Sequence, residues 1–442
     1  MPDQTLTVIG GGLAGSEAAW QAAERGVKVR LFEGRPGLTN GAHVTGDLAE
    51  IVCSNSLGSN DPFSAPGLLK NELRLLRSLI IQTADRFSVP AGSALAVDRG
   101  LFSRQITQTL EAHPNITVLR EEVKEIPLDR PVIIATGPLT SSPMAESLSR
   151  LTQSERLYFF DAISPILEAD SIDRSIVFKA SRYDDGEGDY LNCPMTKEEY
   201  QVFYEALMAG EKVIPKSFEA TPYFEGCMPI EVLAERGVQT PLFGPMKPVG
   251  LLDPRTGKRP YAVVQLRQEN QFASCYNMVG FQTKLRYGEQ KRIFRLIPGM
   301  ENAEFLRFGS LHRNTFIHAP SLLSPTLQLH QDAGVFIAGQ LTGVEGYVEA
   351  SAMGLLAGLN SARAYRGERL LVPPLCTALG ALIHYLTSGD SKHFQPMNIN
   401  FGLFPPLANS VKQKEIRKKM IVNRALEELK NWIQSFSILE TT

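Results

Sequence analysis

The sequence lacks the features that would point to a membrane, a metal or a secreted fold. Its 442 residues contain no apolar run of about 18 residues, so no membrane span is expected. Its five cysteines form no C-x-x-C pair and its seven histidines no H-E-x-x-H spacing, so we expect no metal site. A strand begins almost at once, without a signal or transit segment. These absences predict a cytoplasmic protein with reduced cysteines.

An excess of charge of one sign is also missing. The 45 Lys and Arg residues against 47 Asp and Glu give a net charge of −2, which does not indicate a nucleic-acid partner. Only local stretches are basic, chiefly 284–295 and 412–430, and such runs usually form solvated helix faces. The length predicts two to three domains, and the hydrophobic fraction of 43% is ample for a core.

A dinucleotide-binding fingerprint opens the chain. An apolar strand ending at Ile9 leads into G-x-G-x-x-G, a helix over Ala14–Arg25 and a second strand over Val27–Phe32. The glycines permit a tight turn, close approach of a pyrophosphate and close helix packing, and the helix N-terminus faces the phosphates. Glu33 is placed to accept hydrogen bonds from an adenosine ribose. The predicted cofactor-binding residues here are Gly10, Gly11, Gly12, Leu13, Ala14, Gly15 and Glu33.

A second strand–turn–helix unit lies late in the chain. Gly334–Gly339 is predicted to be a strand and Val348–Tyr365 a helix, while Pro131–Gly137 is an earlier apolar strand ending in Thr-Gly. A second helix N-terminus against the cofactor favours FAD over NAD. Glu345 and Glu349 could act in the site or cap the helix start. The further predicted cofactor-binding residues are Gly137, Gly339, Gln340, Gly343, Gly346 and Tyr347.

These patterns predict an α/β fold with a Rossmann-type FAD-binding domain and a smaller inserted α+β domain. We expect residues 1–189 and 279–442 to form the FAD-binding domain, with the insertion at 190–278. The segment Ser54–Gly67 is predicted to be a loop, followed by one helix over Leu68–Ile81. Further helices are expected over Lys197–Ala209, Leu375–Thr387 and, as an amphipathic helix, Ser410–Phe436.

At Gly334–Asn360 the sequence resembles the flavoprotein family that modifies tRNA uridines, and Ala94–Arg99 is another shared piece. Two branches are related: the wobble-uridine enzymes (GidA/MnmG) and the smaller folate- and FAD-dependent tRNA (uracil-5-)-methyltransferases. The length and five motifs favour the smaller branch. These motifs are Val52–Ser59, Asn192–Met195, Phe224–Glu231, Gly244–Leu251 and Gly280–Pro298.

The resemblance implies methyl transfer from 5,10-methylenetetrahydrofolate to C5 of the T-loop uridine (uridine-54) of tRNA, giving 5-methyluridine. FAD would be methylene carrier and hydride donor, and NAD(P)H the reductant. Uracil C5 is a poor nucleophile unless a thiolate adds to C6. Cys227 is our candidate for that thiolate, and the resemblance implies Cys53 as a second catalytic cysteine. Cys193, Cys275 and Cys376 are interpreted as structural.

The expected partners are tRNA, folate and a nicotinamide nucleotide, without an obligate protein partner. Phosphate contacts are predicted for Lys284, Arg286, Lys412, Lys414, Arg417, Lys418 and Lys419. Three alternatives stay open. A wobble-uridine enzyme would need a partner GTPase, and the C-terminal helical region of that branch is missing here. A plain flavin oxidoreductase would need neither folate nor RNA. A flavin-bound RNA-binding protein would show no turnover.

Overall fold

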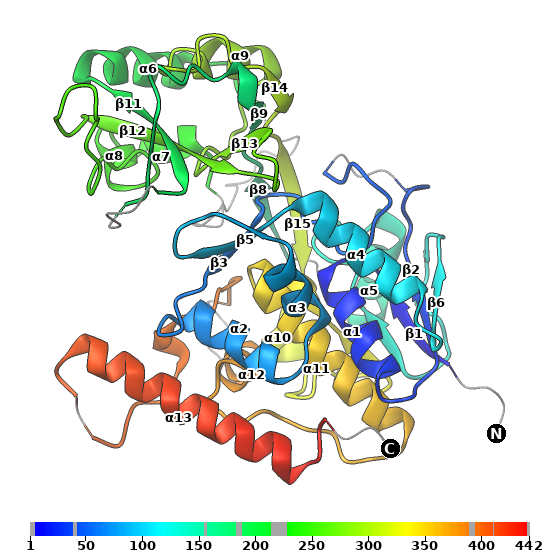
Figure 1. Ribbon diagram of the computed structural model, residues 1–442. Helices are drawn as coiled ribbons and strands as arrows, with labels where there is room; N and C mark the ends of the chain where they lie inside the picture. The colour runs from blue at the N-terminus through cyan, green and yellow to red at the C-terminus, as the bar shows by residue number, and fades with distance from the viewer. Residues whose placement is uncertain are drawn as a thin grey trace.

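The structure is a computed structural model that describes residues 5–38, 42–153, 157–182, 188–213, 228–388, 394–409 and 411–439. Figure 1 shows two lobes joined by a narrow connection. Within the described ranges no helix combines the length and the apolar character that crossing a bilayer requires.

A five-stranded parallel sheet forms the larger lobe, in the order β16–β7–β1–β2–β6. All four residues of the central strand β1 are buried, as expected for a parallel strand covered on both faces. This sheet confirms the predicted Rossmann-type fold. Its strands are β1 (Leu6–Ile9), β2 (Val29–Phe32), β6 (Ile116–Leu119), β7 (Val132–Ile134) and β16 (Val335–Ile337).

Helices α1 (Leu13–Ala23) and α11 (Tyr347–Tyr365) cross at backbone contact beside this sheet (Figure 1). A Cβ on Gly354 would lie 2.2 Å from the Ala14 carbonyl oxygen, and one on Gly358 would lie 2.5 Å from that of Ala18. Only glycine therefore allows this approach. The crossing places the first turns of the two predicted strand–turn–helix units side by side.

An antiparallel six-stranded sheet, in the order β10–β11–β12–β13–β9–β14, forms the second lobe with its own apolar core. Because β9, β10 and β14 come from outside 190–278, the predicted insertion does not enclose this sheet, and we propose Ile166–Arg307 as the extent of the lobe. Its elements are β9 (Ile166–Glu168), β10 (Phe178–Ala180), β11 (Tyr190–Met195), β12 (Ala262–Gln268), β13 (Cys275–Met278), β14 (Phe305–Arg307), α6 (Lys197–Ala209), α7 (Ile230–Glu235), α8 (Thr240–Phe243) and α9 (Tyr287–Phe294).

The antiparallel pair β8 (Leu157–Ala162) and β15 (Leu311–Phe316) runs between the lobes (Figure 1). A small antiparallel sheet, β3 (Ser56–Ser59), β5 (Ala94–Val97) and β4 (Ser88–Val89), lies between the larger lobe and the second lobe. The remaining helices are α2 (Ala65–Leu75), α3 (Leu79–Arg86), α4 (Arg99–Glu111), α5 (Ser142–Thr152), α10 (Ala319–Leu322), α12 (Ala378–Ser388) and α13 (Lys414–Ser435).

Two local predictions were wrong. The segment expected to be a loop contains β3, which pairs with β5, and the start of α2. The helix begins there because the Ser64 side chain accepts a hydrogen bond from the Gly67 amide and caps it. The expected single helix over Leu68–Ile81 is two helices. Arg77 has a φ of 57°, which interrupts the helix, and Ser78 then caps α3.

Candidate active site

A cleft of about 1080 Å³ opens where β1, β2, β7 and β16 end. The carboxyl ends of parallel strands are the usual position of a nucleotide in such sheets. The cleft brings together residues from both ends of the chain. Of the predicted cofactor-binding residues it is lined by Gly10, Gly12, Leu13, Ala14, Glu33, Gly137, Gly339, Gln340 and Tyr347.

The glycines of the first turn differ in what surrounds them. A Cβ on Gly15 would lie 1.7 Å from the Gly10 carbonyl oxygen, and Gly10 itself has a φ of 102°. A Cβ built on Gly12 or Gly137, by contrast, would have no atom of the described residues within 4 Å, apart from those of its chain neighbours. This space beside the α1 N-terminus fits a pyrophosphate, whose charge the helix dipole and free amides favour.

The four other predicted cofactor-binding residues, all glycines, lie elsewhere. A Cβ on Gly11 would meet Leu48, and one on Gly343 would meet Phe394, so both glycines face the protein interior, as Gly15 does. Gly11, Gly15 and Gly343 therefore shape the turns on the side that faces the protein interior. Gly346 lines the second cavity described below.

Glu33 is 8% exposed and makes four hydrogen bonds. Its carboxylate accepts from the Gly11 amide at 3.0 Å and from the Arg35 amide and guanidinium at 2.9 to 3.0 Å. Burial raises the pKa of Glu33, but the hydrogen bonds and charge of Arg35 outweigh it and hold the pKa below its usual value. A carboxylate has about four acceptor positions. The predicted ribose contact would therefore require Glu33 to release one of these bonds.

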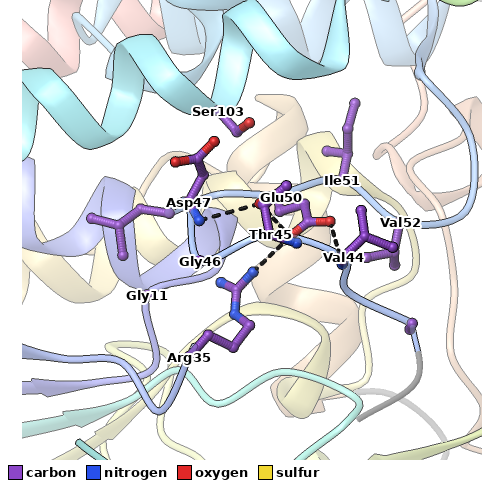
Figure 2. Close-up of polar contacts among 12 residues, drawn as sticks. Gly11, Arg35, Val44, Thr45, Gly46, Asp47, Glu50, Ile51, Val52 and Ser103 are labelled. Atoms are coloured by element: carbon purple, nitrogen blue, oxygen red, sulfur yellow. Dashed lines mark hydrogen bonds and ion pairs between the residues drawn. The ribbon is translucent and has the colours of Figure 1, made fainter. Parts of the chain in front are cut away.

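Arg35 also binds Glu50, with 3.0 Å between Nη1 and Oε2, and Glu50 organises the loop that forms one wall of the cleft. Figure 2 shows the Glu50 carboxylate between Arg35 and the backbone of Val44 and Thr45. It accepts from these two amides at 2.8 and 3.1 Å. Burial, with the charge of Arg35, lowers the pKa of neighbouring His43 to about 4, so this imidazole is neutral at pH 7.

A second cavity, of about 1570 Å³, adjoins the first cleft and lies between the lobes. The two share Val52, Pro138, Leu139, Gln340 and Tyr347 in their linings, so these five residues lie at the boundary between them. Cys53 lines the second cavity. A ligand bound at the dinucleotide turn would therefore lie next to the cavity that is lined by residues 52–54 of the loop around Cys53 (residues 52–55), which we call the Cys53 loop.

Tyr347 holds the Cys53 loop in place. Its phenol oxygen accepts hydrogen bonds from the Cys53 amide at 2.8 Å and from the Ser54 amide at 3.3 Å. Burial raises the pKa of Tyr347, which keeps the phenol protonated. The Cys53 thiol donates to the Ala162 carbonyl oxygen at 3.7 Å. Tyr347, predicted to bind the cofactor, thus has a positioning role toward Cys53.

Three arginines, Arg99, Arg267 and Arg307, bind the loop around Cys53, and we call them the arginine clamp. Arg99 and Arg307 both donate to the Val52 carbonyl oxygen, at 3.2 and 2.8 Å. Arg99 also pairs with Glu269 of the second lobe at 2.5 Å. The loop is therefore fixed from both lobes.

Arg267 of β12 completes the clamp. Its Nε donates to Asn55 Oδ1 at 2.8 Å, and its Nη2 donates to Ser54 Oγ at 2.6 Å. Arg267 is 6% exposed as a residue, and this burial lowers its pKa. Sequence reasoning missed all three arginines, although Arg99 ends the quoted motif Ala94–Arg99.

Cys227, the candidate nucleophile, lies outside the described residues. The described chain resumes at Met228, and the Ile230 amide donates to the Gln282 carbonyl oxygen at 2.7 Å. Gln282 lines the second cavity. The segment that follows Cys227 is therefore anchored at the cavity wall.

The two candidate acids line the second cavity, and the remaining cysteines have raised pKa values. Glu345 and Glu349 line the second cavity and accept hydrogen bonds from Gln340 and Ile399, and burial raises the pKa of Glu349. Burial also raises the pKa of Cys193, Cys275 and Cys376. Across the described ranges, His, Cys, Asp and Glu side chains form no group of three suited to a metal ion.

The predicted RNA-contacting residues fall into two separate groups. Lys284 and Arg286 precede α9 on the second lobe. The others lie just before α13 or in its first two turns, at the opposite end of the molecule in Figure 1. Arg286 pairs with Glu211 at 3.4 Å, which offsets part of its charge. The described structure therefore brings neither group to the cavities. The second group comprises Lys412, Lys414, Arg417, Lys418 and Lys419.

Comparison with known proteins gives a consistent result. The family model described as glucose inhibited division protein A matches residues 5–369. A relative from Citrifermentans bemidjiense, named methylenetetrahydrofolate--tRNA-(uracil-5-)-methyltransferase TrmFO, is 59% identical over 435 residues, covering 98% of this chain and 100% of the relative. One of that name from Heliobacterium modesticaldum is 58% identical over 429 residues, covering 97% and 98%. The solved structure of Aquifex aeolicus GidA in its form I crystal has a TM-score of 0.69 at 19% identity, covering 97% of this chain and 75% of that one, and supports the fold.

Proposed function

The chain belongs to the glucose inhibited division protein A family, and we propose that it is the folate- and FAD-dependent tRNA (uracil-5-)-methyltransferase of that family. It transfers a one-carbon unit from 5,10-methylenetetrahydrofolate to C5 of the T-loop uridine of tRNA. The observation that carries this proposal is the full-length identity of 57 to 59% to proteins of that name. The two adjoining cavities, one at a dinucleotide turn and one at a cysteine loop, are consistent with it.

The first cleft is the proposed place of the FAD pyrophosphate and adenosine. The α1 N-terminus and the open space at Gly12 and Gly137 would receive the phosphates, and Gly339 and Gln340 line the path to the second cavity. Bound FAD would supply the hydride that reduces the transferred methylene to a methyl group. NADH or NADPH is the proposed external reductant.

The chain's own chemistry concerns the uracil ring. We propose that the Cys227 thiolate forms a bond to C6, which moves an electron pair toward C5 and O4 and makes C5 nucleophilic. C5 then bonds to the methylene carbon, and the bond from that carbon to its nitrogen carrier would break as a base takes the C5 proton. Addition of hydride to the carbon would complete the methyl group, and the electron pair returned to the ring then expels the thiolate from C6. Cys53 in the second cavity is proposed to assist removal of that proton.

The test is a methylation assay on an unmodified tRNA transcript with methylene-labelled folate, FAD and NADPH, followed by nucleoside mapping. Label in 5-methyluridine of the T-loop is the expected result. Label at the wobble position would favour the GidA/MnmG-type activity, and NADPH oxidation without label in RNA would indicate a plain flavin oxidoreductase. Cys193→Ser, in the core of the second lobe, is a matched control for Cys227→Ser.

A further inference from the structure

The second cavity has a polar edge that the proposed chemistry does not yet use. Asn277 of β13, Asn314 of β15 and Ser164 line it and are 2 to 3% exposed. Among the described residues the Nδ2 of Asn277 has no hydrogen-bond partner. Buried polar groups are almost always paired in native proteins, so an unpaired amide at a cavity wall indicates a ligand that pairs with it.

The sheet register gives the direction in which Asn277 faces. Asn277 lies directly opposite Arg267 on the neighbouring strand β12. Side chains of directly opposite residues point to the same face of a sheet. Since Arg267 reaches Ser54 and Asn55 on that face, Asn277 also faces the Cys53 loop.

The rest of the lining suits a flat ring. Apolar side chains from both lobes, including Leu57, Leu139, Ile163 and Val279, line the same cavity. Apolar walls with a few placed polar groups are the usual design of a site for a small heterocycle. Asn277 belongs to the second lobe, whereas the dinucleotide turn lies in the larger lobe. Its position therefore favours the substrate ring over the flavin.

We infer that Asn277 binds the imide edge of the target uracil, donating from Nδ2 to O4 and accepting from N3–H at Oδ1. This inference rests on the proposed function. Addition of a thiolate at C6 moves negative charge onto O4, so the donor at O4 bonds more strongly to the addition product than to the free base. Asn277 is thus a residue that both selects uracil and stabilises the charge formed in the reaction.

The chemistry of the two pyrimidines provides the test. Uracil offers an acceptor at O4 and a donor at N3, whereas cytosine offers a donor at N4 and an acceptor at N3. A carboxylate only accepts, so Asn277→Asp should disfavour uracil, because its O4 would face a negative charge, and should keep the bond to cytosine N4–H. Asn277→Leu has a similar volume and removes both bonds.

The experiment compares both variants with Asn302→Asp, an exposed amide-to-acid change on the same lobe. The substrates are two tRNA transcripts with uridine or cytidine at the target position. We expect kcat on the uridine transcript to fall about 100-fold in Asn277→Leu. In Asn277→Asp the ratio of 5-methyluridine to 5-methylcytidine should fall at least about 10-fold, and Asn302→Asp should match the wild type.

Three results would overturn the inference. The first is an unchanged kcat and pyrimidine ratio in both variants. The second is loss of flavin absorbance near about 450 nm in the purified variants, which would assign Asn277 to the cofactor. The third is a raised KM for folate at unchanged kcat, which would assign it to the pterin ring. Failure of the proposed function is a separate outcome, because then the wild type would give no label in RNA.

Discussion

The arginine clamp gives a prediction that can be worked through from the structure. In Arg267→Met the side chain keeps most of its apolar length but loses its hydrogen bonds to Asn55 Oδ1 and Ser54 Oγ. A hydrogen bond from a charged donor contributes about 1.5 to 3 kcal/mol. Loss of only one of the two would therefore make local opening of the Cys53 loop about 10 to 150 times more frequent.

The free energy of global unfolding should change far less than the free energy of opening the Cys53 loop. Burial lowers the pKa of Arg267, which shows that the protein holds this charge at a cost. Replacing this charge by an apolar group removes that cost, which offsets part of the penalty of leaving Asn55 Oδ1 and Ser54 Oγ without their donor. The loop also keeps its bonds to Arg99, Arg307 and Tyr347. We therefore expect faster loop opening with little change in Tm.

Amide hydrogen exchange measures the two effects separately. Exchange of a peptide covering the Cys53 and Ser54 amides, which bond to Tyr347, should accelerate at least about 10-fold in Arg267→Met. Peptides from β1 should be unaffected. Arg255→Met, which breaks a half-exposed ion pair with Asp253 on the same lobe, is the matched control and should leave the loop unchanged. Loop exchange within about twofold of the wild type in Arg267→Met would refute the positioning role of the clamp.

Four further predictions follow from other parts of the molecule. Gly12→Ala should retain its Tm but lose FAD affinity about 10-fold or more, because its Cβ would occupy the open space beside the α1 N-terminus. Gly15→Ala should instead lower the Tm, because its Cβ would lie 1.7 Å from a carbonyl oxygen. Flavin absorbance measures FAD binding and calorimetry measures the Tm, and equal behaviour of the two variants would contradict the placing of the pyrophosphate beside Gly12. Burial raises the pKa of Glu72 to about 8, above its ordinary 4.5, so its contribution to stability is greatest below about pH 4.5 and is lost as the pH rises toward 8. The Tm of Glu72→Gln minus that of the wild type should therefore increase from about pH 5 to pH 8, and a constant difference would count against this effect. Cys227→Ser should abolish methyl transfer while FAD stays bound, and a fully active variant would place the nucleophile elsewhere. Affinity for tRNA should fall steeply with salt if phosphate contacts dominate, and a flat titration would argue against such contacts.

The sequence was sufficient for the parts of the fold that depend on local pattern. The βαβ fingerprint and the late strand–turn–helix unit predicted the parallel sheet because strand, glycine turn and helix follow each other within a few residues. The extent of the second lobe could not be found in this way. Its sheet pairs β9 with β13 and β14, strands that are more than a hundred residues apart in the chain and too short to give a period of their own.

In the candidate site, too, the features set by local sequence could be predicted and those set by distant parts of the chain could not. Most residues of the fingerprint line the first cleft, because the cleft is made of turn backbone that local sequence specifies. The contacts that fix Cys53 come from Arg99, Arg267 and Arg307, and an arginine is common on any protein surface, so no local pattern distinguishes these three. Only the pairing of the strands shows that Asn277 faces the same loop as Arg267.

The position of the clamp has a consequence for how the lobes work together. Arg267 and Arg307 belong to strands of the second lobe, and the loop they bind belongs to the larger lobe. The connecting pair β8 and β15 is only two strands wide, so it alone would allow the lobes to move relative to each other. The charged hydrogen bonds of the clamp restrain that motion at the point where Cys53 enters the cavity. If Asn277 binds the uracil, the clamp then fixes the distance between the ring and Cys53. Asn277 would hold the ring and Arg267 holds the Cys53 loop, and these two residues lie on the same face of one sheet.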